Sequence, residues 1–152
     1  MIRTQGLRYQ YPQGPPLAFA DMDVPQGATL VLRGRSGAGK STWLALVAGL
    51  LTATAGSVTV AGGDPGALAQ SARDAWRART LGFLPQKLHL SDALTVAQNL
   101  NLVYFAAGLP VDPAAVAQAL AALGVAELAA RRPSQLSGGQ AQRVALARAV
   151  LL

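Results

Sequence analysis

The chain has 152 residues, with 13 Lys and Arg against 7 Asp and Glu, and it contains no Cys and only one His. It therefore cannot form a disulfide framework, a Cys-ligated zinc site, a thiol nucleophile or a two-His metal site, so a bound metal would have oxygen ligands. The apolar fraction of 51%, mostly 31 Ala and 24 Leu, fits one folded, helix-rich domain rather than a disordered chain.

The lengths of the apolar segments and the distribution of basic residues indicate where the chain is located and which partners it has. The longest apolar run, residues 44–51, is far shorter than the roughly 20 residues that span a bilayer, and no signal-like apolar stretch follows the N-terminus. We therefore expect a cytosolic chain. The net charge of +6 comes with 11 scattered Arg, of which only Arg131 and Arg132 are adjacent, so no nucleic-acid partner is expected.

The first half of the chain predicts mostly strands. Apolar and β-branched runs bounded by Gly and Pro predict strands at residues 2–11, 17–24, 29–33, 57–61 and 81–84. A helix is expected over residues 40–50, between the third and fourth of these strands.

The second half predicts helices. The composition of residues 95–107 and 113–123 is helical, and Ser137 is placed to cap a last helix that runs through Ala149. The chain shows no internal repeat and no sustained heptads.

A glycine-rich segment follows the apolar run 30–32 and precedes the predicted helix. It satisfies the pattern G-x-x-x-x-G-K-[ST] with Gly34, Arg35, Ser36, Gly37, Ala38, Gly39, Lys40, Ser41 and Thr42. Such a loop turns successive N–H groups toward phosphate oxygens, and the positive end of the following helix adds to them. Lys40 would meet the β- and γ-phosphates and the Ser41 hydroxyl would bind Mg²⁺. The alternative is an ordinary strand-to-helix turn that contains a Lys.

A second glycine turn feeds the last predicted helix. Leu136, Ser137, Gly138, Gly139 and Gln140 precede the segment 141–149. From the residues alone this is a second potential anion site at a helix start, or a simple Ser cap. The sequence Leu-Ser-Gly-Gly-Gln resembles the signature of ATP-binding cassette (ABC) ATPases.

The resemblance to this family extends along nearly the whole chain. Residues 8–12 resemble the strand that carries the adenine-stacking aromatic residue, which implies that Tyr11, or alternatively Tyr9, stacks on adenine. Residues 82–86 resemble the approach to the Q-loop, which implies that Gln86 contacts Mg²⁺ and the attacking water. By the same match, Ser137, Gly138, Gly139 and Gln140 would hold the γ-phosphate of an ATP bound to a partner cassette.

The resemblance implies an α/β fold: a P-loop nucleotide-binding domain of the ABC type, with an antiparallel β subdomain beside a parallel core, and a helical subdomain. Its expected divisions are 1–94 for the β subdomain and phosphate-loop core, 95–136 for the helical subdomain and 137–152 for the signature helix. The implied function is Mg-ATP binding and hydrolysis that drives solute transport. The implied partners are a second cassette, in a head-to-tail dimer, and transmembrane permease subunits at the cytoplasmic face of the membrane. Coupling helices of those subunits would dock near residues 88–96, unless that stretch is a plain loop.

One part of the family pattern is not found. An apolar strand ending in Asp, followed by a general-base Glu, is expected beyond the signature, but the only Glu is Glu127, upstream of it. We therefore expect a cassette truncated after the signature, without the C-terminal part of the core and without ATPase activity alone. The alternatives are a non-catalytic ATP-binding fragment and a DNA-repair type ABC ATPase. The latter is disfavoured because only 96 positions, without heptads, separate Ser41 from Ser137.

Overall fold

The structure is a computed structural model that describes residues 1–151; residue 152, the end of the expected segment 137–152, lies outside the described residues. The chain forms two compact units, one of residues 1–73 and one that starts at Asp74. Each unit is described separately below.

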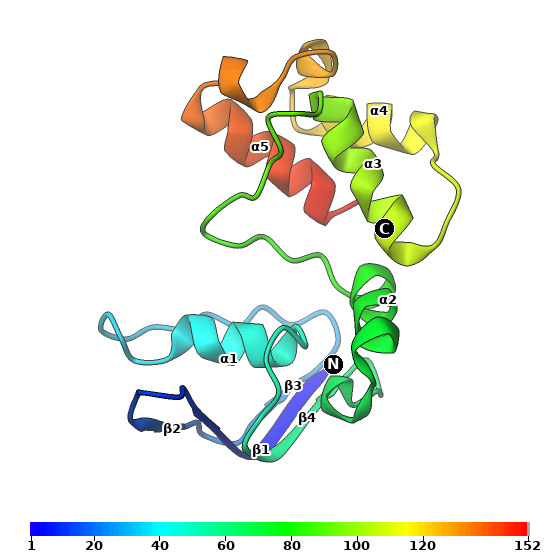
Figure 1. Cartoon of the computed structure of the whole chain (residues 1–152). Coiled ribbons are helices and arrows are strands. Elements are labelled where there is room, and N and C mark those ends of the chain that lie inside the picture. Colours follow the sequence, from blue (N-terminus) through cyan, green and yellow to red (C-terminus); the bar gives the residue numbers. More distant parts are fainter. Residues whose placement is uncertain (152) are drawn as a thin grey trace. The chain divides into compact units, whose positions relative to one another are not determined.

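The first unit is built on a small antiparallel sheet (Figure 1). The long strand β1 (Ile2–Gln10) pairs with β4 (Ala55–Val60), and it also pairs with the two short strands β2 (Pro16–Ala18) and β3 (Met22–Val24). The strand predicted over 17–24 is therefore two strands. The predicted strands at 2–11 and 57–61 are confirmed.

A bulge in β1 changes which residues face the core. The pairing with β4 shifts register between Gln5 and Arg8, and Gly6 lies there with a φ of 54°. The shift explains why Thr4 and Leu7, three residues apart, are both buried, although in a regular strand successive side chains point to opposite faces and these two would differ. Gly56 crosses the bulge so closely that a Cβ would lie 2.4 Å from the carbonyl of Gly6, so only glycine fits there.

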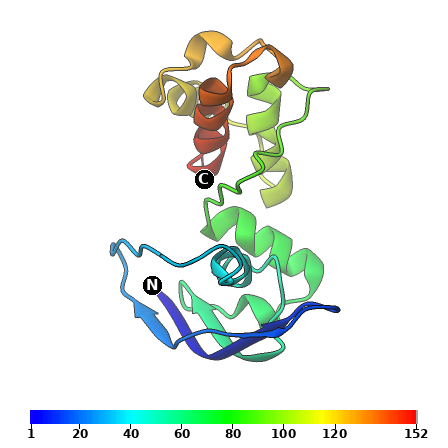
Figure 2. The ribbon, with the colours of Figure 1, turned by 90° about the vertical axis from the view of Figure 1, so that its left-hand side faces the viewer.

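Helix α1 (Lys40–Val47) covers one face of the sheet, and Figure 2 views this helix nearly along its axis above the strands. The core of the unit consists of buried apolar side chains from α1, β1 and β4: Leu7, Trp43, Leu46, Val47, Val58 and Val60. A 3₁₀ turn, η1 (Pro65–Ala67), follows β4. The packing of α1 on the sheet fixes the position of the loop that precedes it.

The second unit is helical. Helix α2 (Gln70–Thr80) begins in the first unit and continues into the second. It is followed by α3 (Val96–Ala107), α4 (Pro113–Ala122) and α5 (Gly138–Ala149), with the 3₁₀ turns η2 (Ala126–Leu128) and η3 (Pro133–Gln135) between the last two helices. The predicted helices at 40–50, 95–107, 113–123 and 137–149 are therefore confirmed, with ends shifted by at most three residues.

Local capping chemistry explains where these helices begin. Thr95 and Ser137 each form a capping box with the Gln three residues later, and Asp112 accepts hydrogen bonds from two amides of α4. Gly108 ends α3 in the left-handed conformation.

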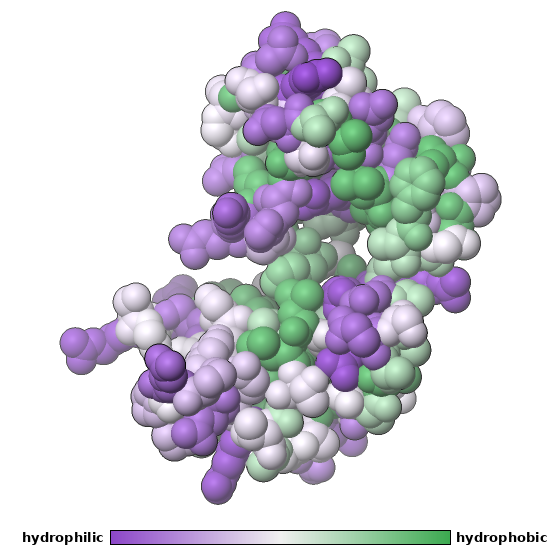
Figure 3. Space-filling model, viewed as in Figure 1, coloured by the Kyte–Doolittle hydropathy of each residue, from purple (hydrophilic) through white to green (hydrophobic). Residues whose placement is uncertain are grey.

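The core of the helical unit lies where α3, α4 and α5 meet. Its buried members are Val96, Leu100, Tyr104, Val116, Leu120, Val125, Leu128, Val144 and Ala147. Other apolar side chains stay on the surface: Figure 3 shows apolar residues gathered over α3, where Leu102 and Phe105 are exposed. None of the helices within residues 1–151 has the length and hydropathy that a membrane crossing needs.

Two strand predictions are wrong. Residues 29–33 and 81–84 are not strands, and no strand of the described chain pairs with either segment. Every pairing within residues 1–151 is antiparallel, so the expected parallel core is not formed there. The physical reason is that a parallel strand is held by its neighbours, and without pairing an apolar run such as 29–33 stays irregular, with Val31 65% exposed.

Candidate functional site

The phosphate-loop segment 34–39 leads directly into α1. Gly37 and Gly39 have φ values of 81° and 79°, a region that side chains with a Cβ disfavour. A Cβ on Gly39 would also lie 3.0 Å from the ring of Phe19. The two glycines therefore allow the tight turn that the sequence predicted and let the backbone lie against the β sheet.

The loop presents backbone donors at the start of α1. The amide of Ala38 closes the loop on the carbonyl of Arg35 at 3.3 Å, and the first helical bond runs from the amide of Trp43 to Gly39 at 2.8 Å. Within the described chain, the amides of Lys40, Ser41 and Thr42 donate no hydrogen bond. These first-turn N–H groups lie at the positive end of the helix, so they can bind an anion.

Lys40 adds a positive charge to the same loop. Its Nζ atom donates hydrogen bonds of 2.8 Å to the carbonyls of both Gly34 and Arg35, so the ammonium group lies across the loop. The side chain of Ser41, the next residue, is exposed. The loop thus combines amide donors and an ammonium group, which suit phosphate oxygens, with an exposed hydroxyl, which suits a divalent cation.

Tyr11 lies beside this loop. Its hydroxyl shares a 3.0 Å hydrogen bond with the hydroxyl of Thr42, which is buried in the first turn of α1. Tyr11 is 43% exposed, and its ring meets the ring of Tyr9 edge to face with 4.8 Å between the ring centres. The structure therefore brings Tyr11 together with residues 34–42. The sequence had placed Thr42 in the loop but gave no signal for its link to Tyr11, which joins segments 31 residues apart.

The signature residues start α5 in the second unit. The Ser137 hydroxyl accepts a hydrogen bond from the amide of Gln140 at 3.3 Å, and the Gln140 side chain accepts one from the amide of Ser137 at 2.8 Å. Ser137 is thus a helix cap, as the simpler interpretation of the motif had it. Gly138 and Gly139 are exposed, and a Cβ on either would meet no atom within 4 Å. The helix start is therefore open to an approaching group.

Gln86 is exposed and lies in the same unit as the signature. It lines a groove of about 600 Å³ together with residues of the signature helix, including Gly139, Gln142 and Arg143. Gln86 and residues 137–140 thus belong to the second unit, whereas Tyr11 and residues 34–42 belong to the first.

The acidic residues have mostly structural partners. Five of the chain's seven carboxylates bond to nearby groups: Asp21 to the amide of Gly6, Asp23 to Arg3, Asp64 to the amide of Gly66, Asp74 to Arg77, and Asp112 to two amides of α4. No cluster of three potential metal ligands among His, Cys, Asp and Glu occurs in the described part of the chain. The chemistry that residues 34–42 support is therefore anion binding by amides and Lys40.

Sequence reasoning missed Asn99. This residue is fully buried in α3, and its side chain bonds to the amide and the carbonyl of Ser91 and to the carbonyls of Leu94 and Thr95. It holds the segment 91–95, which follows Gln86 in the chain. An Asn four residues after a capping Thr, inside an apolar helix, was the available signal.

Comparisons with known proteins agree with this arrangement. The family model described as ABC transporter matches residues 17–152. The chain is 36% identical to the macrolide export ATP-binding/permease protein MacB of Rhodopseudomonas palustris, covering 99% of this chain and 24% of that protein. It is 35% identical to the lipoprotein-releasing system ATP-binding protein LolD 1 of Rhodopirellula baltica, covering 100% of this chain and 69% of that protein. The chain thus spans about a quarter of the first relative.

Solved structures show the same fold. The dimeric structure of MJ0796, a bacterial ABC transporter cassette, superimposes with a TM-score of 0.90 at 27% identity, over 99% of this chain and 69% of that one. A second structure of MJ0796, in a post-hydrolysis state with ADP and Pi, also matches with a TM-score of 0.90. The family model covers most of the chain, and the fold of the matched cassettes is that of both units. The chain belongs to the ABC transporter family, and its fold is that of the ATP-binding cassette.

Proposed function

We propose that the chain binds Mg-ATP through residues 34–42 and acts as the ATP-binding subunit of an ABC transporter. The observation that supports this most is the loop itself, in which the first-turn amides of α1 donate no hydrogen bond and the Lys40 ammonium group lies across the same loop. The matched cassette structure that contains ADP and Pi agrees with a nucleotide ligand.

The residues of the loop suit an ATP triphosphate with Mg²⁺. Lys40 would leave the carbonyls of Gly34 and Arg35 for the β- and γ-phosphates, and the backbone amides from Gly34 to Thr42 would bind phosphate oxygens. Ser41 would bind Mg²⁺ through its exposed hydroxyl, which is an oxygen ligand of the kind this cation prefers. The cation would neutralise phosphate charge, and the protein would hold and orient the nucleotide.

Residues outside the loop complete the proposed site. Tyr11 would stack on adenine, because its ring is exposed and fixed beside the loop by the bond to Thr42. Gln86 would contact Mg²⁺ and the attacking water. Ser137, Gly138, Gly139 and Gln140 would contact the γ-phosphate of ATP on a second cassette, which is consistent with their exposed helix start.

The proposed assembly is a head-to-tail pair of cassettes on transmembrane permease subunits at the cytoplasmic face of the membrane. It is supported by the dimeric state of the matched MJ0796 cassette and by the transport systems named for the relatives. In that assembly, ATP binding and hydrolysis would drive transport of a solute.

Lys40→Ala tests the nucleotide site directly. Loss of a charge-assisted contact of about 1.5 to 3 kcal/mol should weaken Mg-ATP binding about ten- to a hundredfold. The measurement is a titration of a fluorescent ATP analogue into the parent chain and the variant. Lys87→Ala is the matched control, because Lys87 is the only other lysine and lies outside the loop. Equal Mg-ATP affinities of the Lys40→Ala and Lys87→Ala chains would contradict the assignment of residues 34–42 as the nucleotide site.

A further inference from the structure

Two arginines of α5 bind the backbone of other segments in the helical unit. Arg143 donates through Nη1 to the carbonyls of Leu123 and Gly124, at 3.4 and 3.2 Å. Arg148 donates through Nη2 to the carbonyl of Leu88 at 2.6 Å and through Nη1 to that of His89 at 2.9 Å. Arg148 thus spans two successive peptide groups just after Gln86.

The backbone that Arg148 binds is an unusual one. His89 has a φ of 49°, and only Ala61 shares a positive φ among the non-glycine residues within 1–151. Side chains with a Cβ disfavour this region, so a residue remains there when neighbouring contacts hold it. The two hydrogen bonds from the Arg148 guanidinium to Leu88 and His89 are such contacts.

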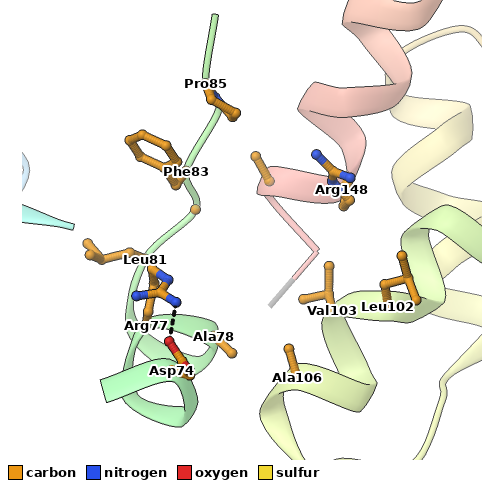
Figure 4. A pocket seen from close by; sticks show the side chains of 12 residues that line it. Asp74, Arg77, Ala78, Leu81, Phe83, Pro85, Leu102, Val103, Ala106 and Arg148 are labelled. Atoms are coloured by element: carbon orange, nitrogen blue, oxygen red, sulfur yellow. Dashed lines mark hydrogen bonds and ion pairs between the residues drawn. The ribbon is translucent and has the colours of Figure 1, made fainter. Parts of the chain in front are cut away.

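The environment of Arg148 strengthens these bonds. The side chain is half-buried, and it lines an apolar groove of about 620 Å³ with Phe83, Pro85 and Leu102 (Figure 4). Burial lowers the pKa of its guanidinium from the usual value. No carboxylate within residues 1–151 forms an ion pair with it, so the two carbonyls are its charge-assisted acceptors.

The same segment is held from its other end by Asn99 of α3, which bonds to Ser91 and Leu94 through its side chain. Arg148 and Asn99 both bond to backbone atoms of this segment. The side chains of Lys87, His89 and Asp92, in contrast, are exposed. The path of residues 88–95 is therefore set by α5 and α3 and is independent of the exposed side chains.

We propose that Arg148 is a positioning residue for Gln86. It fixes the segment after Gln86 to α5, the helix that begins at Ser137, so that Gln86 and the signature residues move as one body. The proposal rests on the proposed role of Gln86 in Mg-ATP binding. The groove that contains Gln86 and Gly139 agrees with it, because the two residues already face the same space.

Backbone nitrogen-15 relaxation tests the holding contact in the full chain. Arg148→Ala should lower the order parameters of residues 86–91 below about 0.6, the range of flexible backbone, while those of α3 and α4 stay near 0.85. Arg143→Ala is the matched control, since it removes an arginine of the same helix that binds residues 123 and 124 instead. Arg148→Lys should restore part of the order, because Lys keeps a cationic donor. Unchanged order parameters at 86–91 in Arg148→Ala would overturn the proposal.

A second readout tests the effect on Gln86. In the parent chain, addition of Mg²⁺ should increase the affinity for ATP; Arg148→Ala should lower this increase about three- to tenfold and leave binding of metal-free ATP unchanged. Arg143→Ala should retain the increase. An undiminished increase in Arg148→Ala would overturn the positioning role. A parent chain that binds no ATP would instead contradict the proposed function, and the relaxation comparison would then show whether Arg148 holds the segment.

Discussion

At the scale of single residues, Tyr11 shows how one side chain can have two separable contributions. Its hydroxyl links the residue after β1 to the first turn of α1 by a hydrogen bond with Thr42, while the residue as a whole remains 43% exposed beside the loop. The hydroxyl has a structural role, whereas the exposed ring is available to a ligand. A pair of variants can therefore separate them.

Tyr11→Phe should bind Mg-ATP within twofold of the parent chain, because it keeps the ring and loses only the hydroxyl. Tyr11→Ala should weaken binding about two- to tenfold, which corresponds to an aromatic stack of about 0.5 to 1.5 kcal/mol. Inorganic tripolyphosphate, which has no adenine, should bind all three chains equally. A comparable loss of tripolyphosphate affinity in Tyr11→Ala would show that the ring supports the loop rather than the base.

At the scale of elements, four of the five α-helices within residues 1–151 were predicted, whereas α2 was missed and several strands were wrong. A helix carries its own signals, such as the capping Ser137 with Gln140 three residues later, or Asp112 followed by Pro113. A strand needs a partner, so the apolar run at 29–33 could not reveal that it stays unpaired. The bulge at Gly6 likewise depends on the close crossing of Gly56, which lies 50 residues away in the chain.

The candidate site also has features that the sequence predicts and features that only the fold creates. The loop 34–39 was predictable because glycine and lysine spacing encodes a local backbone path. The bond between Tyr11 and Thr42 and the hold of Arg148 on residues 88 and 89 were not predictable, because they join segments that only the fold brings together.

Ser137 tests what the start of α5 does. Ser137→Arg should leave the ATP affinity of the isolated chain within threefold of the parent value and should abolish ATP-dependent self-association, because the signature is proposed to act on a partner's nucleotide. Sedimentation velocity with and without Mg-ATP measures this. Ser137→Ala is the control, since it also loses the cap, about 1 kcal/mol of stability, but adds no bulk, and it should retain measurable association. Weaker ATP binding by the isolated Ser137→Arg chain, as large as that of Lys40→Ala, would contradict the role in trans.

At the scale of the whole molecule, each unit has a hydrophobic core of its own. Leu46 of α1 is buried against the sheet in the first unit, and Leu100 of α3 is buried among the helices of the second. Both side chains are at most 2% exposed, so the two positions form a matched pair.

Leu46→Ala and Leu100→Ala should each destabilise the unit that contains the substitution, by about 2 to 5 kcal/mol. Hydrogen exchange should show faster exchange in β1 and β4 for the first variant, and in α4 and α5 for the second. Each variant serves as the control for the other. Equal loss of protection in both units from either substitution would show that they unfold together.

The most direct test of the central claim is to observe the backbone amides of the loop while Mg-ATP is added. In nitrogen–proton correlation spectra of the labelled chain, saturating Mg-ATP should produce the largest shifts at Gly37, Gly39, Lys40 and Ser41, whose amides lie at the turn and the start of α1. The Lys40→Ala chain should need about ten- to a hundredfold more Mg-ATP to show them. Shifts that spare residues 34–42, or that are identical in both chains at every concentration, would contradict the account.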